Sequence, residues 1–138
     1  MIASFDDLLQ AARAQAAPQR LLLVFAGAEL PDGASATQRA EFEAGQGGAL
    51  VPLMCVDKRP EEITSFAQLC TEADAMHSGW RVMLAGALSG QQGAAPTDQA
   101  VDQALERLLG HIQAGRMEQV LSQTLAFTRD GQAVALKD

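Results

Sequence analysis

The sequence predicts a single α/β domain spanning residues 1–138. Its expected architecture is a three-layer α/β/α arrangement with a mostly parallel sheet of about five strands, including a C-terminal antiparallel hairpin. The length of 138 residues suits one ordinary domain. Helical segments alternate with short apolar runs, an order typical of parallel strands joined by crossover helices. Near the end, two short alternating runs flank Asp130 and Gly131, which is typical of a β-hairpin.

The first half of the chain is expected to contain two helices around one strand. Ser4 followed by Asp7 is typical of a helix N-terminus, and this helix must end before Pro18. The run 21–28 is apolar without interruption, as in a parallel strand covered on both faces. A turn at residues 31–33 and a modest helix over residues 35–44, ending at Gly45, are then expected, followed by a flexible joint at residues 46–48.

The second half is expected to contain the remaining strands and two more helices. A strand is predicted at 49–57, with Pro52 near its start or on a sheet edge because proline cannot donate to the ladder. A helix is predicted to begin at Pro60, where two acidic residues follow the proline. The segment 117–123 is compatible with either a helix or an extended entry into the hairpin. A strand, a long helix and the hairpin complete the prediction, at residues 80–88, 96–115 and 125–136.

Composition and charge argue against several classes of partner. The formal net charge is −7 and the sequence pI is about 4.7, so the electrostatic field repels nucleic-acid phosphates and anionic lipids. With no Tyr and one Trp, the chain has few aromatic side chains on which bases could stack. The N-terminus has acidic residues where a signal peptide has basic ones, and the two cysteines have no disulfide or metal spacing. We therefore expect a cytoplasmic protein that binds neither nucleic acid nor membrane.

Polar residues at the expected strand ends are the candidate ligand-binding site. In an open parallel sheet, ligands bind in the crevice beyond the carboxyl ends of the strands. This rule selects residues that follow the three apolar runs: Glu29, Asp57, Lys58, Arg59 and Ser89. Solvated turn residues are the competing interpretation of the same side chains.

A thiol or acid–base centre formed by Cys55, Asp57 and Lys58 is the alternative site. Neighbouring cations favour the thiolate form of a cysteine, but Cys55 lies inside an apolar strand, where an inert packed thiol is also expected. His77 and His111 have no other ligand residue at metal-binding spacing. We therefore predict no metal site and no cofactor.

Four segments of the chain resemble a family of small proteobacterial proteins: residues 22–26, 42–48, 52–58 and 87–90. The resemblance extends over most of the chain. Members of that family are often labelled ribonucleotide reductase subunit alpha. A catalytic subunit of that kind would need a large barrel and a redox cysteine pair, which this length and these two cysteines do not allow. We therefore assign no catalytic residue to this chain from the resemblance. The hairpin at 127–132 also resembles the end of a thioredoxin-like domain, although the CxxC motif of that family is missing here.

The sequence thus leaves three hypotheses about function. The leading one is a non-catalytic module that binds a small molecule or a protein partner and has a regulatory role, because no catalytic constellation is present. The alternative is a small thiol or acid–base enzyme, a thioredoxin-like variant without CxxC. The third is a structural subunit that forms a homo-oligomer.

Overall fold

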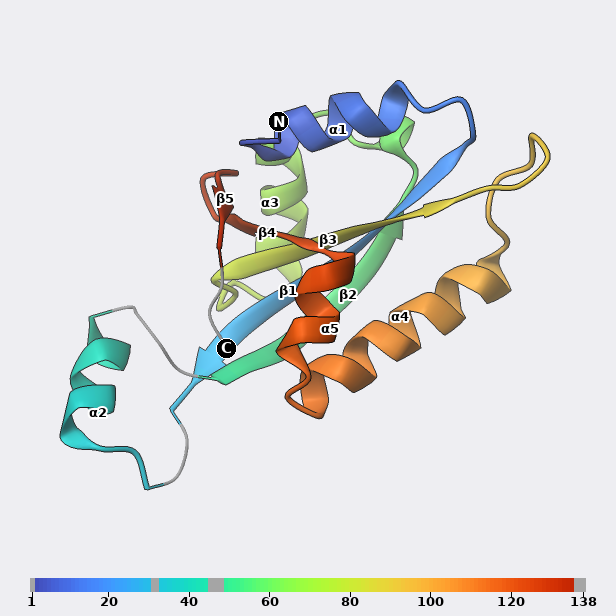
Figure 1. The fold of residues 1–138 in the computed structure, drawn as a ribbon. Coiled ribbons are helices and arrows are strands. Elements are labelled where there is room, and N and C mark those ends of the chain that lie inside the picture. Colours follow the sequence, from blue (N-terminus) through green and yellow to red (C-terminus); the bar gives the residue numbers. More distant parts are fainter. Residues whose placement is uncertain (1, 31–32, 45–48, 136–138) are drawn as a thin grey trace.

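A single antiparallel sheet forms the centre of the protein (Figure 1). The computed structural model describes residues 2–30, 33–44 and 49–135. Five strands lie in the order β2-β1-β3-β4-β5, and each is antiparallel to its neighbours. Their bounds are β1 Gln19–Glu29, β2 Ala49–Lys58, β3 Val82–Ser89, β4 Leu125–Thr128 and β5 Ala133–Val134.

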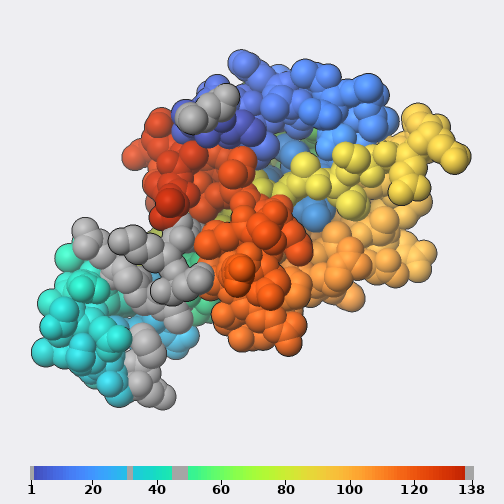
Figure 2. Space-filling model, in the orientation of Figure 1, coloured from blue at the N-terminus to red at the C-terminus, as the bar shows by residue number. Residues whose placement is uncertain are grey.

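Helices cover both faces of the sheet. One face is covered by α1 (Phe5–Arg13) and α3 (Phe66–Met76), which pack on the first hydrophobic core. The opposite face is covered by α4 (Asp98–Gln113) and α5 (Met117–Gln123), which pack on the second core. Helix α2 (Ala36–Glu43) has no buried residue and projects from the body of the molecule (Figures 1 and 2).

The side chains of the strands alternate between these two cores. On β1, Leu21, Leu23 and Phe25 point toward α1 and α3, whereas Val24 and Ala26 point toward α4 and α5. All of them are almost completely buried. The uninterrupted apolar run of β1 therefore comes from its central position in a sheet with helices on both faces.

The predicted mostly parallel sheet is wrong. The prediction assumed that each helix between two strands is a crossover that restores the strand direction. Helix α2 does not pack on the sheet, so β1 and β2 form an antiparallel pair whose connection contains a projecting helix. Between β3 and β4 the chain forms two helices, and it returns antiparallel to β3. Strands β2 and β3 run parallel with β1 between them, and no two adjacent strands of the described sheet are parallel.

Most of the predicted elements are confirmed, with one correction of detail. Ser4 caps α1 through a capping box with Asp7, and the segment 117–123 is the helix α5. The helix predicted to begin at Pro60 is divided into a short 3-10 helix, η1 (Pro60–Glu62), and α3. Ile63 is extended, and Ser65 starts α3 by accepting a hydrogen bond from the Gln68 amide. Some predicted features lie outside the described residues: positions 31–32 of the turn, the helix end at position 45, the joint at 46–48 and position 136 of the hairpin.

Strand β2 is the outer strand of the sheet and the longer of the two edge strands. Its ten residues compare with two in β5. A β-bulge interrupts its pairing with β1, because Phe25 lies opposite Met54 while Ala26 lies opposite Pro52. The extra residue, Leu53, packs with Met54 against the first core, on the α3 side of the sheet. From Val51 to Lys58 every side chain is only partly buried, in contrast with β1.

Candidate functional site

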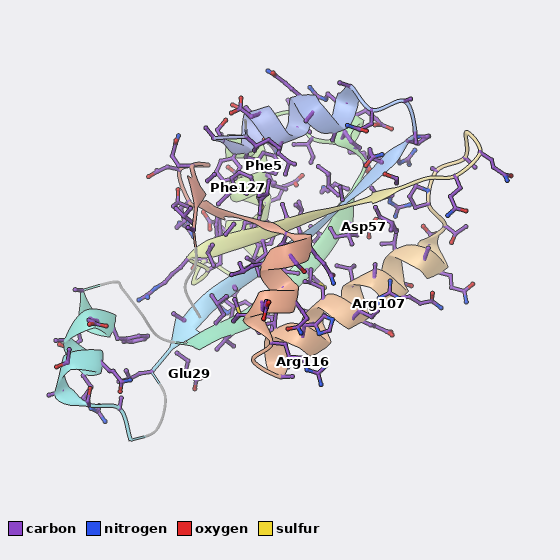
Figure 3. All side chains as sticks on the ribbon, in the orientation of Figure 1. Phe5, Glu29, Asp57, Arg107, Arg116 and Phe127 are labelled. Carbon is purple, nitrogen blue, oxygen red and sulfur yellow. The ribbon has the colours of Figure 1, made fainter. Side chains whose placement is uncertain are left out.

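The predicted site residues do not form one crevice. In the antiparallel sheet Asp57 lies opposite Leu22 and Ser89 opposite Gln19, so these residues share the end of the sheet where β1 begins. Glu29 lies at the other end of β1, opposite Ala49. Figure 3 shows Glu29 and Asp57 well apart. We expected the carboxyl ends of all three strands to meet because we expected parallel strands. In the antiparallel sheet they lie at different ends, so this expectation is wrong.

Asp57 is part of an ion-pair cluster on the α4 side of the sheet. The guanidinium of Arg20 donates to Asp57 through Nε at 3.0 Å and through Nη2. Its Nη1 donates to Asp98 at the start of α4, at 3.3 Å. Hydrogen bonding to Asp57 raises the pKa of Arg20. This cluster joins β1, β2 and α4, so Asp57 has a structural partner for its charge.

The other candidates also have intramolecular partners. Lys58 points to the opposite side of the sheet, where its Nζ lies 3.2 Å from Glu72 of α3. The Nε of Arg59 lies 3.4 Å from Glu62. The hydroxyl of Ser89 accepts a hydrogen bond of 2.9 Å from Nε2 of Gln19, whose residue is buried. The candidates are therefore distributed over two faces of the sheet and do not lie together in one place.

Cys55 does not have the surroundings of an activated thiol. It packs against the second core, on the α4 side. Burial, with a smaller contribution from the charge of Asp57, raises the pKa of its thiol. A nucleophilic cysteine needs the opposite shift, toward the thiolate. Lys58, the cation expected to lower this pKa, lies on the other face of the sheet and pairs with Glu72.

The largely apolar hollow beside β2, which we call the edge groove, is a site that sequence reasoning missed. It has a volume of about 290 Å³. Its apolar walls come from β1, β2 and α3: Phe25, Met54, Val56, Leu69, Ala73 and Met76. Met76 is 67% exposed, the most exposed of the large hydrophobic side chains among the described residues. Lys58 and Glu72 complete the lining.

A smaller hollow, which we call the polar pocket, continues from the edge groove. It has a volume of about 140 Å³ and shares Lys58, Leu69 and Glu72 with the groove. Polar residues predominate in the remaining lining: Glu62, Ile63, Thr64, Ser65 and Gln68. Hydrogen bonding from the Arg59 amide lowers the pKa of Glu62, which keeps that carboxylate charged. The edge groove therefore forms an apolar compartment along β2, and the polar pocket, with Glu62 and Glu72, forms an acidic compartment beside it.

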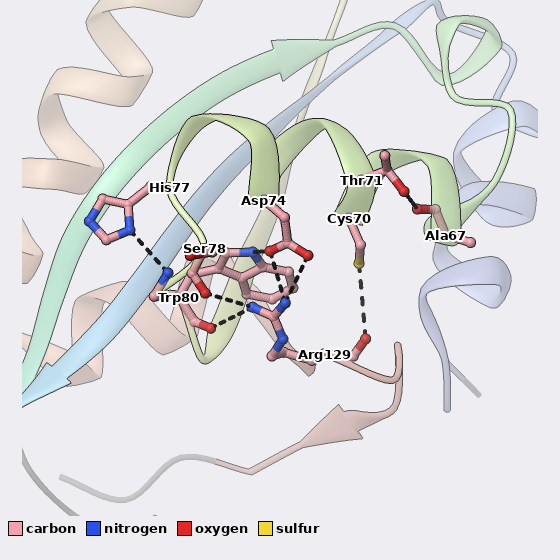
Figure 4. Close-up of polar contacts among 9 residues, drawn as sticks. Ala67, Cys70, Thr71, Asp74, His77, Ser78, Trp80 and Arg129 are labelled. Carbon is pink, nitrogen blue, oxygen red and sulfur yellow. Dashed lines mark hydrogen bonds and ion pairs between the residues drawn. The ribbon is translucent and has the colours of Figure 1, made fainter.

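A polar cluster holds the C-terminal end of α3 beside the groove (Figure 4). Both carboxylate oxygens of Asp74 accept hydrogen bonds from Arg129, at 2.8 and 2.9 Å. The indole Nε1 of Trp80 also donates to Asp74, at 3.0 Å. The Trp80 ring lies 4.3 Å from the Arg129 guanidinium and 5.0 Å from the ring of Phe25. The groove-lining Phe25 is thereby in contact with a cluster that joins α3 to the C-terminal hairpin.

Within the described ranges no three His, Cys, Asp or Glu side chains gather in a metal-binding arrangement. Nδ1 of His77 accepts a hydrogen bond from the Gly79 amide at 3.1 Å. Nδ1 of His111, on α4, is buried without a hydrogen-bond partner in the described part of the chain. No described helix combines the length and apolar character required to cross a membrane.

Comparisons of the chain with protein-family models, with curated proteins and with solved structures find no match. The functional proposals therefore rest on the geometry of this chain.

Proposed function

We propose that the protein is a non-catalytic interaction module that binds an extended segment of a partner protein as an additional strand on β2. The single observation behind this proposal is the position of the edge groove beside the outer strand of the sheet. In binding by strand addition, main-chain hydrogen bonds supply affinity and pockets for alternate side chains supply specificity. The outer edge of β2 offers main-chain groups for hydrogen bonds, and the edge groove offers a pocket for side chains.

The segment Met54–Lys58 is the suitable part of this edge. Proteins usually protect exposed edge strands with prolines, bulges or charged residues. Here Pro52 and the bulge occupy the first half of β2, where they interfere with regular pairing. From Met54 to Lys58 the register with β1 is regular, and the groove runs beside this segment. Every second side chain of an added strand would point toward α3 and the groove.

The shape and lining of the groove favour a polypeptide over a small metabolite. Small-molecule sites are typically cavities of about 300–1,000 Å³ that bury most of the ligand and orient it with a few placed polar groups. The edge groove is a modest hollow with mainly apolar walls, and its two charged groups already pair with each other. Such a surface matches apolar side chains presented by an extended backbone.

Selection of peptides, followed by amide hydrogen exchange, tests the proposal. Linear twelve-residue peptides displayed on phage are selected against the protein, and the enriched peptides are synthesised. We expect them to slow amide exchange in residues 54–58 and to bind the Met76→Asp variant at least about tenfold more weakly, because the new charge lies in the groove. Val134→Asp is the matched control, since Val134 is exposed on β5 at the opposite edge of the sheet.

Three results would overturn the proposal. The first is that no peptide is enriched. The second is that enriched peptides bind wild type and Met76→Asp equally well. The third is that light scattering detects a stable dimer in which β2 is already protected from exchange, since a second copy of the chain would then occupy the edge.

A further inference from the structure

We infer that the partner segment has a basic residue two positions before a large apolar residue, in a Lys/Arg-x-Leu/Met pattern, and that it runs antiparallel to β2. This inference rests on the proposed function and specifies the chemistry of the partner. It follows from the order of the apolar and acidic compartments along the strand.

The two compartments have the spacing of alternate residues in a strand. Met54 lines only the edge groove, whereas Lys58 lines both hollows, so β2 runs from the apolar compartment toward the acidic one. Side chains on one face of a strand recur about every 7 Å. Val56 also lines only the edge groove and lies two residues before Lys58. When the side chain of an added strand opposite Val56 fills the groove, the next side chain on the same face therefore reaches the ion pair of Lys58 and Glu72.

The charges around that position favour a cation. Both nearby basic residues, Lys58 and Arg59, are already paired with carboxylates, those of Glu72 and Glu62. Glu61 adds an exposed carboxylate that has no ion pair among the described residues. With a net charge of −7 for the chain, the long-range field also attracts basic segments. The polar pocket itself is lined by two carboxylates, Glu62 and Glu72, and by one cation, Lys58, so a lysine or arginine at this position is attracted and a glutamate is repelled.

The direction of the added strand determines the order of the two residues. All neighbouring strands in the sheet are antiparallel, and antiparallel pairing is slightly more stable per residue. A strand antiparallel to β2 passes Lys58 before it reaches Met54. Its basic residue therefore precedes its apolar residue.

Three matched peptides test this inference, with the sequence Lys-Thr-Leu, Leu-Thr-Lys or Glu-Thr-Leu placed in an otherwise identical neutral ten-residue peptide. The fluorescence of Trp80 is the readout, because its ring contacts the groove-lining Phe25 and it is the one tryptophan of the chain. We expect the Lys-Thr-Leu peptide to bind about tenfold more tightly than the Glu-Thr-Leu peptide at low salt, with a smaller difference in 0.5 M salt. The Leu-Thr-Lys peptide should bind more weakly than Lys-Thr-Leu.

Protein variants separate a local effect from the general acidity of the chain. Glu72→Gln should reduce the preference for Lys over Glu to about threefold. Glu106→Gln removes an equal charge from an exposed position on α4 and should leave the preference unchanged.

The possible failures are distinguishable. If all three peptides bind with equal affinity, or if Glu106→Gln reduces the preference as much as Glu72→Gln, the charge inference is refuted while strand addition stands. If Leu-Thr-Lys binds more tightly than Lys-Thr-Leu, the antiparallel direction is wrong. If none of the three binds, and the peptides selected on phage also fail to protect residues 54–58, the proposed function itself is refuted.

Discussion

Replacing Arg129 with alanine should destabilise the protein by about 2–3 kcal/mol. The ion pair with Asp74 is partly exposed, with side-chain exposures of 42% and 38%, so its contribution is about 0.5–1 kcal/mol. The hydrogen bond to the Trp80 carbonyl, 2.8 Å long, contributes about 1 kcal/mol. The cation–π contact with the Trp80 ring adds about 0.5–1 kcal/mol.

Urea unfolding followed by circular dichroism measures this loss without relying on Trp80 itself. For a chain of this size, the expected loss corresponds to a decrease in Tm of about 6–10 °C. Arg107→Ala is the control, because Arg107 is exposed on α4 and forms no ion pair within the described residues. Its substitution should cost less than about 0.5 kcal/mol.

A double-mutant cycle isolates the contact between the two charged groups. Asp74→Ala and Arg129→Ala, made separately and together, should show a coupling energy of about 1 kcal/mol. If Arg129→Ala costs no more than Arg107→Ala, or if the cycle shows no coupling, the cluster does not hold α3 against the hairpin. The groove-lining Phe25 would then lose the support that this cluster gives it through Trp80.

Three further predictions concern a loop, a helix and a thiol. Gly90→Ala should destabilise the protein by about 1–3 kcal/mol in thermal unfolding, because a Cβ there would overlap the Ala94 carbonyl; an unchanged Tm would contradict the loop geometry. Gly110→Ala should instead stabilise it by about 0.5–1 kcal/mol, since nothing lies near the added Cβ in α4, and a lower Tm would count against this. Cys55 should react with iodoacetamide more slowly than a free thiol at neutral pH, because burial raises its pKa. The thiol of Cys55 ionises more readily in the unfolded chain, so the free energy of unfolding should decrease as the pH rises through the folded-state pKa of Cys55. A Cys55→Ala variant should lack this decrease in stability at alkaline pH.

The local elements were largely predictable because they depend on nearby residues. Ser4 and Asp7 identify the start of α1, and Thr97 caps α4 by accepting a hydrogen bond from the Ala100 amide. Strand β1 was recognisable from its apolar run. The proline at position 52 was expected near the start of a strand or on an edge, and it lies in the outer strand β2.

Strand direction was not predictable because it depends on contacts between distant parts of the chain. A helix between two strands is equally compatible with a crossover and with a projecting excursion, and only its packing distinguishes them. Helix α2 has no buried residue. Its sequence nevertheless contains apolar residues such as Ala40 and Phe42, so from the local pattern alone it cannot be distinguished from a helix that packs on the sheet. The error in direction then displaced the candidate site, because Glu29 and Asp57 are neighbours only in a parallel arrangement.

The topology of the sheet itself accounts for the edge groove. Helix α3 connects β2 to β3, and these two strands run parallel with β1 between them. Its buried residues Leu69 and Ala73 share a core with the side chains of β1 and β3. On the opposite face, α4 passes close to β2. The α3 side of β2 is therefore the less covered surface of the sheet, and a strand added at this edge would extend the sheet beside the groove that the exposed Met76 lines.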